Sequence, residues 1–185
     1  DMRQLIFIDA DISGSEFIEC DLTKSSFLNP VANRVKFTGS KLNGVTFVNI
    51  VGSESNFDGA EMEKVGFVGG ADLIGSSFCG ANVIGSNLRE CNLQKARFTE
   101  SKISGSDFGG ANLREADFSR VDGTGAQFNK ADMSFAVLER ANLMEGSMYE
   151  TIISGARLID ANLYCVNFMG CTVGDTDFSG AYLAK

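Results

Sequence analysis

The sequence predicts an all-β fold in which the chain winds into a four-sided coil of parallel rungs. Three regularities predict it: a large apolar residue recurs at every fifth position, a small residue stands two positions before most of these, and phenylalanine takes only alternate apolar positions. An α-helix rotates by about 140° over five residues, which would scatter the apolar set around its surface. On a flat strand an odd step places successive members on opposite sides. A chain that turns after each five residues keeps the whole set inside.

The large apolar residues, called centres here, form two runs. The first run begins at Phe7 and ends at Phe67. One additional residue near 69–70 shifts the register, and the second run continues from Leu73 to Leu183. A repeat that returns to the same side after four five-residue steps has a length typical of a solenoid. We therefore expect about nine coils and a rod about 40 Å long.

Assigning the centres to four faces in rotation separates the phenylalanines from the aliphatic residues. Face 1 holds Phe7, Phe27, Phe47, Phe67, Leu88, Phe108, Phe128, Met148 and Phe168. Face 3 holds Phe17, Phe37, Phe57, Phe78, Phe98, Phe118, Leu138, Leu158 and Phe178. Faces 2 and 4 hold none, and only Phe135 lies outside the scheme. This distribution predicts two opposed columns of stacked rings, each buried ring contributing up to about 3 kcal/mol.

Two segments of face 2, residues 29–34 and 49–54, offer only alanine or glycine as the centre. Since a valine precedes each small centre, we expect the chain to slip by one residue so that Val31 and Val51 fill the core. A local cavity is the alternative. Pro30 has no N–H and should remove one coil-to-coil hydrogen bond.

Residues 122–126 leave a further gap, because Gly123 stands where a large centre is expected. These irregular segments are either tolerated defects, or a bend or a loop that a partner recognises. Because the repeat continues throughout, we expect residues 1–185 to form a single β-helix domain, with a one-residue insertion near 69–70. Neither end shows a capping helix, so we expect a piece of a longer chain, or ends that pack against copies of themselves.

Several segments match one five-residue motif closely, namely "ANLRE", "ADFSR", "ADMSF", "ANLME" and "ANLYC". They resemble the pentapeptide repeat family, whose motif is a small residue, Asp or Asn, Leu or Phe, and two polar or small residues. The resemblance covers nearly the whole chain and implies a right-handed quadrilateral parallel β-helix. The family includes the Qnr and MfpA quinolone-resistance proteins, acidic rods that bind DNA gyrase and dimerise through a C-terminal helix, whereas this sequence ends inside a repeat. Other members are secreted bacterial effectors.

Composition and motifs argue against catalysis. The chain has no histidine, and it shows no nucleophile elbow, phosphate-binding loop, dinucleotide glycine motif or paired-cysteine metal spacing. We expect no catalytic residue, no cofactor and no metal site. The net charge of −8 disfavours direct nucleic-acid binding, and no apolar stretch approaches a membrane span of about 18 residues.

The five cysteines cannot all pair. Cys20, Cys91 and Cys171 take the small inward position, whereas Cys79 and Cys165 are expected to be exposed on different faces. Unpaired cysteines favour a cytosolic location, with a secreted effector as the alternative.

The residue after each centre points to solvent, and on face 1 it is apolar in four successive coils. These residues, the apolar stripe, are Ile8, Leu28, Val48 and Val68, and Tyr149 and Met169 follow further along. Because a contiguous apolar patch often marks an interface, we expect a non-catalytic rod that binds another protein, or itself, through this face. A face covered by a preceding segment of a longer chain, a DNA mimic that binds gyrase, and the repeat domain of a secreted effector are the alternatives.

A second cluster is expected on face 3, where four arginines come near acidic residues. The arginines are Arg97, Arg120, Arg140 and Arg157, and the acids that interleave with them are Glu100, Glu139 and Asp160. We interpret this cluster as solvated ion pairs.

Overall fold

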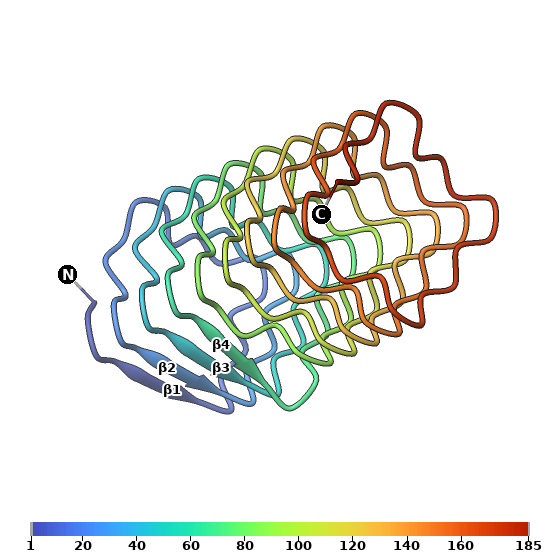
Figure 1. The fold of residues 1–185 in the computed structure, drawn as a ribbon. Helices are drawn as coiled ribbons and strands as arrows, with labels where there is room; N and C mark the ends of the chain where they lie inside the picture. The colour runs from blue at the N-terminus through green and yellow to red at the C-terminus, as the bar shows by residue number, and fades with distance from the viewer. Residues whose placement is uncertain (1, 185) are drawn as a thin grey trace.

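The computed structural model describes residues 2–184, which wind into one stack of parallel rungs (Figure 1). These residues contain no helix. Each rung pairs with the one a full turn later, as in the bridges Asp11–Val31 and Asn92–Asn112. The partners are twenty residues apart, so the four-sided coil that the five-residue period predicts is confirmed.

The regular strands lie on face 1, at the N-terminal end of the stack (Figure 1). They are β1 (Ile6–Ile8), β2 (Ser26–Leu28), β3 (Thr46–Val48) and β4 (Gly66–Val68), paired in parallel in that order. Their register places the four phenylalanine centres in one line. Corner residues with positive φ follow, for example Asp9 at 51°, and this left-handed conformation ends each extended side.

The core contains the two ring columns that the sequence predicts. Along face 3, the ring of Phe98 stacks on Phe78 and on Phe118, with centroids 4.6 and 4.7 Å apart. Across the core, Phe98 meets Phe108 of face 1 edge-on, at 5.5 Å and 88°. The edge-on geometry suits the ring quadrupole, so the two columns support each other as well as burying apolar surface.

The predicted slip at face 2 is wrong. Val31 and Val51 stay outside, with 40% and 46% of their surface exposed, whereas Ala32 and Gly52 keep the inward centre position. The space is filled from the other inward position of the same side, where Ile50 is buried. A Cβ on Gly52 would lie only 3.3 Å from the Cδ1 atom of Ile50, so no slip is needed to close the core.

The prediction that Pro30 removes a coil-to-coil hydrogen bond is wrong. The ladder continues on both sides of the proline, through Asn29 N–H to Val48 O at 2.8 Å and Val31 N–H to Ala10 O at 3.0 Å. At the position of Pro30, the described coils before and after also lack a backbone bond from the nitrogen, at Ala10 and Ile50. Proline therefore occupies a position where its missing N–H costs little.

The other irregular places are closed by their neighbours. Ile103 and Leu143 reach over Gly123, and a Cβ there would come within 3.0 and 2.9 Å of their side chains. The extra residue lies at a corner, where Gly69 and Gly70 both have positive φ, and pairing resumes at the bridge Val51–Asp72. The coil is therefore continuous through both places.

Candidate protein-binding face

The apolar stripe consists of the last residue of each of the four strands. Because strand residues alternate in direction, the buried centres of β1–β4 force the residue after each of them outward. Strand pairing then aligns Ile8 with Leu28, Leu28 with Val48, and Val48 with Val68. The end members are the more exposed, Ile8 at 62% and Val68 at 45%, while the middle two are half-buried by their neighbours. The result is a flat apolar ridge on a backbone fixed by parallel hydrogen bonds.

A second outward column runs beside the stripe, on the other side of the centres. Its members are Ile6, Ser26, Thr46 and Gly66, so after the first coil it is built of small residues. Neither column of β1–β4 contains an ionisable side chain. After the first coil, face 1 therefore presents an apolar ridge beside a column of small residues, without an ionisable side chain in either column of β1–β4.

The corner that follows the stripe carries a ladder of amides. Asn29 donates from Nδ2 to Asp9 Oδ1, and Asn49 donates in the same way to Asn29 Oδ1, both at 2.9 Å. These bonds pair the corner side chains with one another along the border of the stripe.

Tyr149 and Met169 lie in the same column as the stripe but are not contiguous with it. Arg89, Gly109 and Asn129 stand between them and Val68. The Arg89 guanidinium lies 3.1 Å from Asp107 Oδ2 and covers Gly109, so the middle of the face is polar. The column thus has two apolar ends.

Sequence reasoning missed two kinds of exposed apolar residue. Val31 and Val51, expected inside, are paired outside on face 2, around the corner from the stripe. Phe135 lies at a corner between faces 2 and 3, with φ of 62° and 56% exposure, and the Arg114 guanidinium carbon is 5.6 Å from its ring centroid. Phe135 lies outside the five-residue period, and this feature of the sequence could have predicted that its ring points outward.

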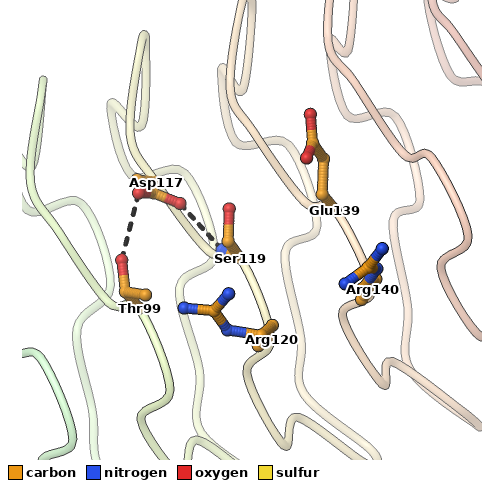
Figure 2. A pocket seen from close by; sticks show the side chains of 6 residues that line it. All are labelled: Thr99, Asp117, Ser119, Arg120, Glu139 and Arg140. Atoms are coloured by element: carbon orange, nitrogen blue, oxygen red, sulfur yellow. Dashed lines mark hydrogen bonds between the residues drawn. The ribbon is translucent and has the colours of Figure 1, made fainter.

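Face 3 holds a polar depression of about 300 Å³, shown in Figure 2. Its lining residues are Thr99, Asp117, Ser119, Arg120, Glu139 and Arg140. Arg120 pairs with Glu100 at 2.8 Å, and Arg157 pairs with Glu139 at 2.6 Å. The predicted ion-pair cluster is therefore present, and its charges are largely compensated at an exposed site where such pairs contribute little.

The carboxylate of Asp117 is partly buried in this depression. Partial burial acts to raise its pKa, but hydrogen bonds from Ser119 and Thr99, with the charge of Arg97 nearby, outweigh burial and hold the pKa below its usual value. Figure 2 shows both bonds on this carboxylate. It is therefore an ionised structural acceptor without the raised pKa that a general acid requires.

The cysteines are unpaired in the structure. Cys91 is buried, Cys165 is exposed, and Cys79, which was expected to be exposed, is half-buried. Burial raises the pKa of the Cys91 thiol to about 12. Within residues 2–184 no group of three or more side chains is arranged to hold a metal ion, and no helix is long and apolar enough to cross a membrane.

A comparison with protein-family models decides the family. The model for pentapeptide repeats matches eight copies, at residues 33–65, 69–105, 106–144 and 124–158, which together span more than half of the chain. The chain belongs to the pentapeptide repeat family. The right-handed quadrilateral β-helix that the sequence resemblance implied is thereby confirmed. Proteins of this family generally serve structural and interaction roles.

Solved structures of the same family resemble this one. HetL, a heterocyst differentiation protein of the cyanobacterium Nostoc, is 18% identical, with 99% of this chain and 89% of HetL covered and a TM-score of 0.45. Full-length QnrB1, a plasmid-mediated fluoroquinolone resistance protein, is 16% identical, with 91% and 93% covered and a TM-score of 0.47. A comparison with curated proteins finds no match.

Proposed function

We propose that this pentapeptide repeat protein is a non-catalytic rod that binds another protein through face 1. The observation that supports the proposal is the alignment of Ile8, Leu28, Val48 and Val68 in one uncharged ridge. Backbone pairing holds the ridge rigid before binding, so a partner would lose little free energy to ordering it. Tyr149 and Met169 extend the same column at its far end and belong to the proposed interface.

The direct test places charge on the ridge. The double variant Val48→Lys/Val68→Lys should lose binding, because two ammonium groups would have to be desolvated against an apolar partner surface. The matched control is Val31→Lys/Val51→Lys, the same pair of substitutions at exposed valines on face 2. Binding is measured as self-association by sedimentation and as capture of partners from native lysate. Unchanged association and capture in the double variant would overturn the proposal.

A gyrase-binding DNA mimic is the rival function, supported by the net charge of −8 and by the fluoroquinolone resistance named for QnrB1. A DNA mimic needs a face dominated by carboxylates. Here the acids alternate with cations, as in the pairs Lys95–Glu115, Arg114–Asp132 and Lys130–Glu150. We therefore favour the apolar face, and a gyrase supercoiling assay with and without quinolone separates the two functions.

A further inference from the structure

We propose that the partner of face 1 is a second copy of this chain, packed face to face with the two rods parallel and related by a twofold axis along their length. The inference rests on the proposed function and names the occupant of its site. It depends on three features: the shape of the two outward columns, the charges at their borders, and the length over which they continue.

Shape selects the direction of the twofold axis. An axis parallel to the rods exchanges the two outward columns, so the stripe of one copy lies over the small-residue column of the other. Leu28 then lies over the partner's Ser26, and Val68 lies over the partner's Gly66, which places large side chains opposite small ones. The first coil, where both columns carry isoleucine, is the exception within β1–β4.

An axis across the rods gives the opposite result. It would place stripe upon stripe and small column upon small column, so that large side chains meet each other and small ones leave unfilled space between the copies. Because packed sheets lie about 10 Å apart and need interdigitated side chains, this antiparallel arrangement buries less apolar surface.

Charge at the borders supports the parallel arrangement. The corner before face 1 carries the exposed cations Lys24 and Lys64, and the corner after it carries the exposed acids Asp9 and Glu90. The parallel twofold brings opposite borders together, with each lysine offset by only about one coil, or 4.8 Å along the rods, from an acid of the other copy. The antiparallel axis would bring the two basic borders together.

The same relation continues along the whole column. Tyr149 lies over the partner's Ser147, and Arg89 is already neutralised by Asp107 of its own chain. In the parallel dimer, Glu145 of one copy faces Glu150 of the other at the same coil. Lys130 lies 3.7 Å from Glu150 within its own chain and compensates that charge. A strip about 40 Å long and 13 Å wide covers roughly 500 Å² per copy. This is less than the roughly 800 Å² of a standard stable interface, so we expect a weak dimer that forms in the micromolar range.

Sedimentation equilibrium and a distance between two labels test the inference together. In a variant with Cys20, Cys79 and Cys171 changed to serine, a spin label on the exposed Cys165 reports the arrangement. Parallel rods place the two labels roughly 20 Å apart, whereas antiparallel rods centred on the stripe place them more than about 50 Å apart. A concentration-dependent dimer with the short distance is expected, and the long distance would overturn the inference.

A charge exchange provides a second readout. Lys64→Glu and Glu90→Lys should each weaken the dimer about two- to fivefold, and an equimolar mixture of the two variants should recover the original affinity. Failure of the mixture to recover would contradict the parallel pairing. If the unmodified protein stays monomeric up to millimolar concentration while another protein is captured by it and lost with Val48→Lys/Val68→Lys, this inference fails and the proposed function stands.

Discussion

Ser86 shows how single buried residues join the coils. Its hydroxyl accepts a hydrogen bond from Val65 N–H at 3.0 Å and donates one to Met62 O at 2.7 Å, both in the preceding coil. Thr151 donates in the same way to Phe128 O, and the thiol of Cys171 lies 2.7 Å from Met148 O. The small inward position therefore accepts polar residues where they link one rung to the next.

Replacing Ser86 by alanine should lower the free energy of unfolding by about 1–3 kcal/mol, because buried polar groups lose a partner. Ser86→Thr is the matched control, since threonine keeps the hydroxyl and is already used at Thr151. Urea denaturation measures both variants. An alanine variant as stable as the unmodified protein would show that this hydroxyl does not tie the coils together.

Cysteine reactivity should follow burial. The raised pKa of Cys91, about 12, keeps the thiol protonated at neutral pH, whereas Cys165 is exposed at a corner. Since the thiolate is the nucleophile, we expect a maleimide to modify Cys165 within minutes and Cys91 only after unfolding. Mass spectrometry of timed samples measures this order, and early modification of Cys91 would contradict its buried place.

At the scale of the element, the ring columns stabilise the rod. Phe98 is fully buried between Phe78 and Phe118, so it supports the coil before it and the coil after it. Phe135, outside the period, packs its ring over Gly155 instead and contributes to the surface. Inward and outward phenylalanines of one chain thus offer a direct comparison.

Phe98→Ala should destabilise the protein by about 3–5 kcal/mol, because it leaves a cavity in a stacked column. Phe135→Ala should change stability by less than about 1 kcal/mol, since an exposed ring leaves no cavity. Thermal and urea unfolding measure the two. Equal losses in both variants would mean that the ring columns are not the main support of the coil.

At the scale of the whole molecule, the five-residue period was sufficient to predict the fold, because neither a helix nor a flat strand can bury centres at that spacing. The exposed stripe followed from the same geometry, since a buried Phe47 forces Val48 outward. The slip at face 2 was wrongly predicted because the size of Gly52 was judged alone, while Ile50 supplies the missing volume. The column of small residues beside the stripe could not be predicted as part of an interface, because small residues contribute to binding only through the side chains that face them.

The central functional claim is that the ridge of face 1 is an interface, and methyl NMR over a concentration or partner titration tests it most directly. The methyl signals of Ile8, Leu28, Val48 and Val68 should shift together on binding. Those of Ile18 and Ile152, exposed on other faces, should stay in place. Shifts confined to Ile18 or Ile152, or a stripe that never responds while binding occurs, would contradict the account.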